Sequence, residues 1–258
     1  PSDHDQAALA KITLFSLSTH SSGLRRLSAN KVSSSDGDPY SKYDRKMLIE
    51  ALREEGPVAP TGRATVYSNF GVAVLGEALG AAWDMSYAHA LRNHVLDPLG
   101  MAATTIGLSG SPSPANFPPG HFDGRAVPNW TFQAYAPAGA LRSTVRDMAR
   151  FLGACLAHGK GALTAAIATT VQPQRENPDS GGYMGLGWFI TEEGTIWHGG
   201  VTGGSTAFLG YTPKVGAGVV ILANTDVPSQ SLGFRLLGVS FPQRKAGAGR
   251  KGSVRNGA

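Results

Sequence analysis

Cysteine occurs only once in the sequence, and no apolar run approaches the roughly 20 residues of a membrane-spanning helix. The single Cys155 excludes an internal disulfide, and its apolar position in an expected helix predicts a place in the core. The short apolar runs predict no membrane span. The first residues also lack the charged start and apolar stretch of a secretion signal. With 258 residues, of which 41% are hydrophobic, the chain is long enough to bury a sizeable core.

Acidic residues are missing from the C-terminal segment 244–258, which holds five basic residues. The rest of the chain carries 18 basic and 18 acidic residues, so the formal net charge of +5 comes from this segment. A basic, glycine-rich end is typical of a solvated, disordered tail. We therefore predict one domain over residues 1–243, a disordered tail over 244–258 and no nucleic-acid partner.

Apolar residues recur at helical spacing in the middle of the chain. Helices are expected at residues 45–55, 72–79 and 87–95. Ser143 has the features of an N-cap that opens a further helix. The stretch 109–130 is dense in Pro, Gly and Ser and predicts a long surface loop. These patterns indicate a mostly helical region over about residues 20–170.

After Gly185 the pattern changes to short runs of aromatic and β-branched residues. Residues 188–191 and 195–198 flank the turn sequence Glu-Glu-Gly, and residues 205–212 and 219–224 flank a second turn. These runs predict antiparallel strands within residues 185–240. The predicted fold class is therefore α/β in the broad sense (α+β), with an antiparallel sheet beside a helical region.

One polar cluster, Tyr67-Ser68-Asn69, lies just before a predicted helix. A Tyr and an Asn two residues apart at a helix entrance are able to point into one cleft. A phenol has an ordinary pKa near 10, so it serves as a base at neutral pH only beside cations. Taken alone, such a short cluster is more often a core Tyr with a capping Asn than a functional site.

A second cluster, His198-Gly199-Gly200, ends one predicted strand. Glycines at this place let a ligand approach an open strand edge, where the amides of Gly200 and Val201 are free to donate. The imidazole can donate to a substrate carboxylate or carbonyl. Taken alone, a His-Gly-Gly is more often a bulge or a turn than a functional site.

These clusters belong to an ordered series that resembles the serine β-lactamase and penicillin-binding-protein superfamily, on its class C side. The series includes Ile-Thr-Leu at 12–14, Ser-Thr-His-Ser-Ser-Gly-Leu at 18–24 and Gly-Leu-Gly-Trp at 185–188. It covers roughly residues 10–240. The resemblance implies an antiparallel sheet flanked by helices, with an all-helical subdomain and a C-terminal helix at residues 229–237 that packs on the sheet.

The resemblance also implies three catalytic elements: Ser-x-x-Lys, Tyr-x-Asn, and Lys-Thr-Gly or a variant such as His-Gly-Gly. By position, Tyr67 and His198 match catalytic residues, Tyr67 as the general base and acid. The matching substrate-binding residues are Asn69, Gly199, Gly200 and Val201. The N–H of Val201 matches one half of the oxyanion hole. No metal or organic cofactor is implied, because an acyl-enzyme route needs none.

The nucleophile is absent from its implied place, several dozen residues before Ile12, so we expect a chain that is truncated before this segment or lacks it. One Ser-x-x-Lys occurs, at Ser28 and Lys31, but no helical pattern follows it to set the Lys one turn from the Ser. We expect the chain to need a complementing N-terminal segment. Without it, the following side chains are expected to lack a packing partner: Trp188, Phe189, Phe208 and Leu209.

Three functions follow from this pattern. The first is a β-lactamase-related serine hydrolase, incomplete or inactive as the chain stands, whose acyl-enzyme route acts on a β-lactam, a D-Ala-D-Ala peptide or a related amide. The second is an esterase on the same scaffold, which His198 favours because a Lys suits substrate carboxylates better. The third is a non-catalytic binding or scaffold homologue. The expected partner is a small-molecule or peptide substrate, and the resemblance implies a periplasmic or extracellular location.

Overall fold

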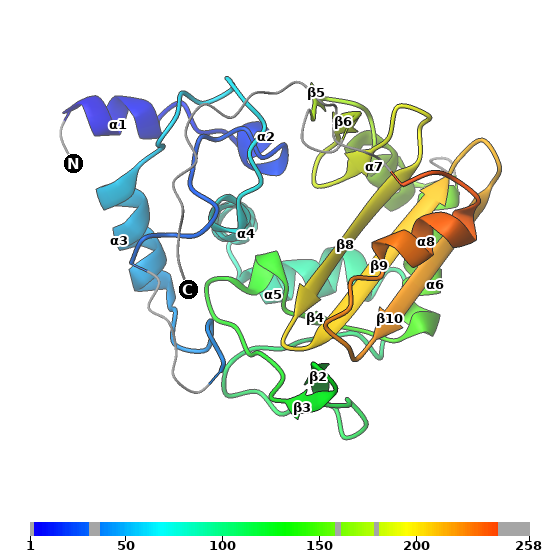
Figure 1. The fold of residues 1–258 in the computed structure, drawn as a ribbon. Coiled ribbons are helices and arrows are strands. Elements are labelled where there is room, and N and C mark those ends of the chain that lie inside the picture. Colours follow the sequence, from blue (N-terminus) through cyan, green and yellow to red (C-terminus); the bar gives the residue numbers. More distant parts are fainter. Residues whose placement is uncertain (1–2, 31–36, 158–160, 178–180, 242–258) are drawn as a thin grey trace.

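A helical layer lies beside an antiparallel sheet in the computed structural model, which describes residues 3–30, 37–157, 161–177 and 181–241 (Figure 1). This arrangement confirms the predicted fold class. The predicted tail 244–258 and Lys31 lie outside the described residues. In the described part of the chain, no helix is long and apolar enough to cross a membrane.

The helical layer is built from short helices with polar caps. They are α1 (Asp3–Leu9), α2 (Leu14–Ser18), α3 (Arg45–Glu55), α4 (Asn69–Ala82) and α5 (Tyr87–Leu91), which a π-helical turn over Arg92–Leu96 continues. Asp44 caps α3 by accepting from the N–H of Met47, and Ser68 caps α4 by accepting from the N–H of Gly71. Each cap satisfies a backbone donor that the first turn of a helix leaves without a partner. The caps therefore fix where α3 and α4 begin.

A buried cluster holds this layer together. Leu24, Leu48, Phe70 and Tyr135 are each at most 1% exposed and belong to one core. Tyr135 is distant in sequence from the other three residues and lies just before the 3₁₀ turn Ala136–Ala138. That turn packs against α4. The core therefore ties the N-terminal helices to a segment that enters the sheet region.

The contact between α4 and the 3₁₀ turn depends on Gly76. A Cβ atom added at Gly76 would lie 2.0 Å from Cγ of Pro137, a rigid ring. We expect Gly76→Ala to lower the free energy of unfolding by about 1–3 kcal/mol, the usual range for overpacking. Gly153 is the matched control, because it is exposed in a helix and its added Cβ meets nothing within 4 Å.

In urea unfolding, Gly153→Ala is expected to be more stable by about 0.5–1 kcal/mol, since alanine is the better helix former. Opposite shifts of the two midpoints are the expected result. A shift of both variants in the same direction would contradict the close packing at Gly76.

The sheet has six strands in the order β10-β9-β8-β7-β6-β5, and every neighbouring pair is antiparallel. The strands are β5 (Arg175–Glu176), β6 (Tyr183–Met184), β7 (Phe189–Ile190), β8 (Ile196–Thr202), β9 (Ser205–Thr212) and β10 (Ala217–Ala223). Both predicted hairpins, β7–β8 and β9–β10, are confirmed. The helices α6 (Val145–Leu156) and α7 (Ala162–Thr170) precede the sheet in sequence, and α8 (Gln230–Leu237) follows it.

The sheet is covered by helices on both faces (Figure 1). Alternation along β9 sends Leu209 and Tyr211 to the face that packs on α6, and Phe208 to the face that packs on α8. Phe234 of α8 lies 5.7 Å from the Phe208 ring, measured between centroids. Cys155 is partly buried on the α6 side, and burial raises the pKa of its thiol to about 12. The predicted core position of this cysteine is therefore confirmed in part, because Cys155 packs against the core without being fully buried.

Several local predictions were wrong. The helix after Ser143 begins one residue later, because the side chain of Thr144 accepts from the N–H of Asp147. The predicted loop 109–130 contains a hairpin of β2 (Gly120–Phe122) and β3 (Arg125–Val127). The four side chains expected to lack a packing partner all have one. Phe208 and Leu209 are only 1% and 6% exposed, because α8 and α6 cover them, and Trp188 and Phe189 pack against the same two clusters.

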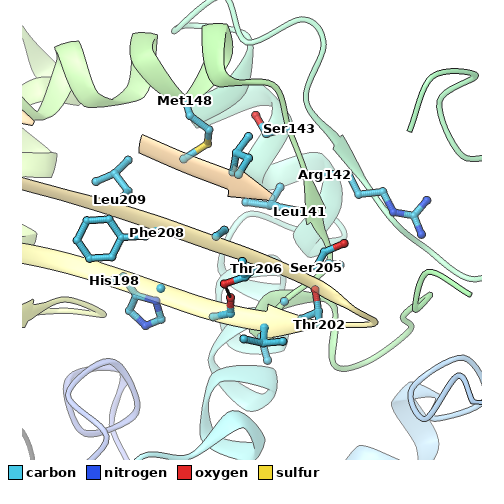
Figure 2. Close-up of a pocket in the computed structure, with 18 of the residues that line it drawn as sticks. Leu141, Arg142, Ser143, Met148, His198, Thr202, Ser205, Thr206, Phe208 and Leu209 are labelled. Atoms are coloured by element: carbon cyan, nitrogen blue, oxygen red, sulfur yellow. Dashed lines mark hydrogen bonds between the residues drawn. The ribbon is translucent and has the colours of Figure 1, made fainter. Parts of the chain in front are cut away.

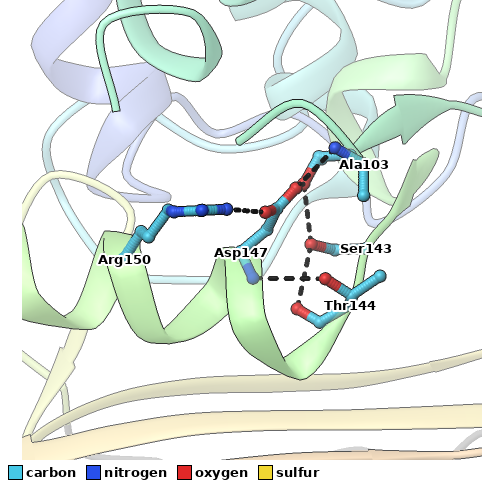
Figure 3. A network of polar contacts seen from close by, with 6 residues as sticks. Ala103, Ser143, Thr144, Asp147 and Arg150 are labelled. Carbon is cyan, nitrogen blue, oxygen red and sulfur yellow. Dashed lines mark hydrogen bonds and ion pairs between the residues drawn. The ribbon is translucent and has the colours of Figure 1, made fainter. Parts of the chain in front are cut away.

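One carboxylate fixes the entrance of α6 (Figure 3). Asp147 accepts from the backbone N–H of Ala103 and the hydroxyl of Thr104, both at 2.9 Å, and pairs with Arg150 at 2.6 Å. The hydroxyl of Ser143 lies 2.8 Å from that of Thr104. The network therefore joins the loop after the helical layer to the helix that covers the sheet.

Candidate active site

A cavity of about 1440 Å³ lies between the helical layer and the sheet. It exceeds the roughly 300–1,000 Å³ of most small-molecule sites. All six residues predicted to act in catalysis or substrate binding line it: Tyr67, Asn69, His198, Gly199, Gly200 and Val201. The fold therefore brings together two clusters that lie far apart in the sequence.

The backbone around Tyr67 is held in place by His20. The N–H of Ser68 donates to Nδ1 of His20 at 3.2 Å, and the N–H of Val66 donates to the His20 carbonyl at 2.8 Å. His20 has a φ of +53° and is 3% exposed. A non-glycine residue rarely adopts this left-handed conformation, and it persists only where the surroundings enforce it. His20 thus fixes the chain on both sides of Tyr67.

The Tyr67 ring is enclosed by other rings and one cation. Its centroid lies 4.3 Å from the His20 ring and 6.2 Å from the Phe189 ring. The guanidinium carbon of Arg26 lies 5.3 Å above it. Burial raises the pKa of Tyr67 above 10, and the positive charge of Arg26 partly opposes that rise. The phenol is therefore protonated at neutral pH.

His20 is also neutral at pH 7. Burial lowers its pKa to about 4, with smaller contributions in the same direction from His198 and Arg26. Since Nδ1 accepts the N–H of Ser68, the proton of the neutral ring is on Nε2. The imidazole that supports Tyr67 consequently has a defined tautomer.

The second cluster, His198-Gly199-Gly200, lies where β8 is paired with a strand on one side only. β7 pairs with β8 only at Ile196 and Trp197, while β9 pairs with it from Ile196 to Thr202. Beyond Trp197, no strand in the described ranges covers the other side of β8. The backbone from His198 onward therefore presents an open edge to the cavity.

His198 is partly buried and neutral. Its ring lies 5.3 Å from Phe189 and 6.4 Å from Tyr67, centroid to centroid. Burial lowers its pKa to about 4, so the side chain carries no charge at pH 7. Figure 2 shows it on the strand beside Phe208 and Leu209 of β9.

The glycines of this cluster differ in the space around them. A Cβ at Gly199 would meet the carbonyl oxygen of Ala207 at 2.9 Å, whereas a Cβ at Gly200 would meet nothing within 4 Å. The Gly200 carbonyl accepts from the hydroxyl of Thr206 at 3.2 Å (Figure 2). Gly200 therefore leaves open space beside the strand edge for an approaching ligand.

Ser28 does not reach this cavity. It is 4% exposed, and both its N–H and its hydroxyl lie within 3.1 Å of the Tyr135 hydroxyl in the core of the helical layer. No helix begins at Ser28. The structure thus separates this serine from Tyr67 and His198, and its partner Lys31 lies outside the described residues.

Three residues that line the cavity were not predicted as site residues: His20, Arg26 and Phe189. The sequence pointed to Phe189 only as a side chain expected to lack a packing partner. His20 lies in the Ser-Thr-His-Ser-Ser-Gly-Leu segment at 18–24, and this motif was the one sequence feature that could have marked it as a site residue. Its role depends on a contact with Ser68, 48 residues away, which no local pattern reveals. In the described part of the chain, no group of three or more His, Cys, Asp or Glu side chains is placed to hold a metal ion.

The family model described as Beta-lactamase matches residues 3–237. Beta-lactamase-like protein 2 of Dictyostelium discoideum is 34% identical over 92 residues, which are 34% of this chain and 16% of that protein. A class C β-lactamase structure from Rhodobacter sphaeroides has a TM-score of 0.68 at 21% identity, covering 88% of this chain and 73% of its own. The octameric penicillin-binding protein homologue from Pyrococcus abyssi has a TM-score of 0.72 at 23% identity, covering 90% and 57%.

The match thus spans about a sixth of the curated relative, and less than two thirds of the archaeal structure. At these identities the solved structures establish a shared fold. The family model covers nearly the whole chain. The chain belongs to the beta-lactamase family.

Proposed function

We propose that this chain forms the substrate-binding walls of a serine hydrolase that acts through an acyl-enzyme on a β-lactam, a D-Ala-D-Ala peptide or a related amide. The observation that carries the proposal is the cavity shared by Tyr67, Asn69 and His198. Asn69 binds the substrate amide. The N–H of Val201, on the open edge of β8, supplies half of the oxyanion hole, a contribution worth about 3–4 kcal/mol of barrier.

Tyr67 is suited first to a donor role. Its raised pKa keeps the phenol protonated at pH 7, so it is able to give a proton to the leaving group. A base role needs a further cation to favour the phenolate. The lysine of a Ser-x-x-Lys element, which the family resemblance implies, supplies such a cation.

The size of the cavity supports a complementing segment that carries the nucleophile. An α-helix is about 10 Å wide and rises 1.5 Å per residue, so 1440 Å³ corresponds to a helical segment on the order of ten residues. Within the described ranges, no Ser-x-x-Lys lines the cavity. The proposal therefore includes an N-terminal segment with Ser-x-x-Lys that fills part of this space and leaves the rest to substrate.

Intact-mass spectrometry tests the proposal. The chain is incubated with a fluorescent penicillin, alone and with an added N-terminal segment that bears Ser-x-x-Lys at a helix start. We expect no adduct on the chain alone and one stoichiometric adduct on the added segment. A segment with the serine changed to alanine is the matched control. An adduct on the chain alone, mapped to a serine such as Ser28, would place the nucleophile within these residues and contradict the proposal.

An esterase on the same scaffold is the second candidate, and the neutral His198 favours it because a neutral imidazole does not attract a substrate carboxylate. Labelling by an activated ester, with none by penicillin, would select this function. The third candidate is a non-catalytic binding protein, which the lack of a cavity-lining Ser-x-x-Lys in the described part of the chain favours. Absence of any adduct in every sample would select that one.

A further inference from the structure

The cavity wall is positively charged. Among the described residues that line it there is no Asp, Glu or Lys, and its charged side chains are Arg26 and Arg142. Its two central histidines, His20 and His198, are neutral at pH 7 because burial lowers the pKa of each to about 4. A cleft lined by charge of one sign raises the local concentration of ligands of the opposite sign. The ligand of this cavity is therefore expected to be an anion.

Arg142 is already engaged by the protein. Its guanidinium donates to the Ser113 hydroxyl at 2.6 Å and to the Trp130 carbonyl at 3.0 Å, and it lies 4.9 Å from the Phe117 ring centroid. The residue is 7% exposed. These contacts hold the loop that walls one end of the cavity, so Arg142 has a structural role.

Arg26 has no such engagement. It is exposed and forms no ion pair or side-chain hydrogen bond with another described residue. Its guanidinium lies over the Tyr67 ring, with the guanidinium carbon 5.3 Å from the ring centroid. A cation–π contact of this kind orients a guanidinium without using up its N–H donors. The donors of Arg26 are thus available beside Tyr67.

We propose that Arg26 is a specificity-determining residue that binds a carboxylate of the substrate next to Tyr67. This inference rests on the proposed function, and it names the residue that binds the free carboxylate of a β-lactam or a D-Ala-D-Ala peptide. The planar guanidinium matches a carboxylate with two parallel N–H···O bonds. Arg26 thereby takes the charge-recognition role that a neutral imidazole at position 198 does not fill.

A reversible binding experiment tests Arg26 without needing a nucleophile. The full chain is titrated with N-phenylacetylglycine and, separately, with its neutral carboxamide, and binding is followed by nuclear magnetic resonance of the tyrosine rings. Arg26→Gln is compared with wild type, and Arg25→Gln is the matched control. Arg25 is the preceding residue, pairs with Glu55 at 3.8 Å and does not line the cavity.

Wild type and Arg25→Gln are expected to bind the carboxylate about 2–5-fold more tightly than the carboxamide, the upper part of the range for an exposed ion pair. Arg26→Gln is expected to bind both probes equally, with an unchanged thermal midpoint, and Arg26→Lys to keep part of the preference. Equal binding of both probes by wild type, no binding of either, or a preference that survives in Arg26→Gln would overturn the proposal.

The covalent labelling of the proposed function is a separate readout. If the carboxylate preference depends on Arg26 but penicillin never forms an adduct, this inference is kept and the hydrolase function is rejected. If penicillin forms an adduct but the carboxylate preference is missing, the hydrolase function is kept and this inference is rejected. The preference is also expected to weaken as salt rises, because Arg26 is exposed and its charge is screened.

Discussion

Replacing Asp147 with alanine is expected to lower the free energy of unfolding by about 1–3 kcal/mol, the cost of leaving a buried hydrogen-bonding group without its partner. The Asp147 side chain is 2% exposed, and its removal leaves the N–H of Ala103 and the hydroxyl of Thr104 without their acceptor. Asp147→Asn keeps an acceptor oxygen without the charge, so it is expected to lose less. Urea unfolding followed by circular dichroism measures both variants.

The matched control is Asp97→Ala. Asp97 also pairs with an arginine, Arg92, at 3.4 Å, but its side chain is 57% exposed. Exposed ion pairs contribute roughly 0–1 kcal/mol, so this variant is expected to unfold close to wild type. Similar losses in the two alanine variants would show that the Asp147 network does not fix the entrance of α6.

Acid is expected to destabilise the chain through its two cavity histidines. In the unfolded chain a histidine has a pKa near 6.5, whereas burial lowers the pKa of His20 and of His198 to about 4 in the fold. The unfolded state therefore binds more protons between these values, and stability falls as pH drops from about 6.5 to about 4. One such histidine accounts for about 3 kcal/mol over this window, with little further change below it.

His20→Asn tests this dependence. Asparagine tolerates a left-handed backbone, and its side-chain oxygen is able to accept the N–H of Ser68 as Nδ1 does. The variant is expected to show a shallower loss of stability between pH 6.5 and 4 in urea unfolding at a series of pH values. His198→Asn is expected to do the same from the sheet side. Carboxylates titrate in wild type and variants alike, so a slope that is identical in all three proteins would refute the assignment.

Regular elements with a long apolar pattern could be predicted from the sequence. Residues 45–55 show the helical spacing of α3, and residues 205–212 are β9 as predicted. The helix α2 has only five residues, too few for a periodic pattern to identify it. It depends on a capping box in which Thr13 and Ser16 each bond the backbone of the other.

The hairpin β2–β3, which was not predicted, has a sequence signal in its turn. Asp123 and Gly124, between β2 and β3, have φ values of +49° and +73°. Asp-Gly is a favoured pair for the two-residue hairpin turn that needs positive φ at both positions. The Pro and Gly content of residues 109–130 suggested a loop, although this dipeptide favoured paired strands.

The residues of the candidate site also fall into those that the sequence could predict and those that it could not. Tyr67, Asn69 and His198 could be selected because each lies in a local motif within an ordered series. Arg26 and Phe189 could not, since only folding places them around the Tyr67 ring. Their contacts join segments that share no local pattern, and a single sequence does not encode such distances in readable form.

The open edge of β8 has a consequence for the behaviour of the chain at high concentration. A strand with unpaired backbone groups on one side is a template for another strand, and exposed edges promote aggregation. From His198 to Val201 this edge opens into a cavity whose opposite wall carries Tyr67 and Asn69. Two adjacent glycines, which favour strand structure little, occupy the edge. The helical layer therefore also shields this edge of the sheet from a second molecule. If the layer moved away from the sheet, the unpaired edge of β8 would be exposed and would promote aggregation before the core unfolds.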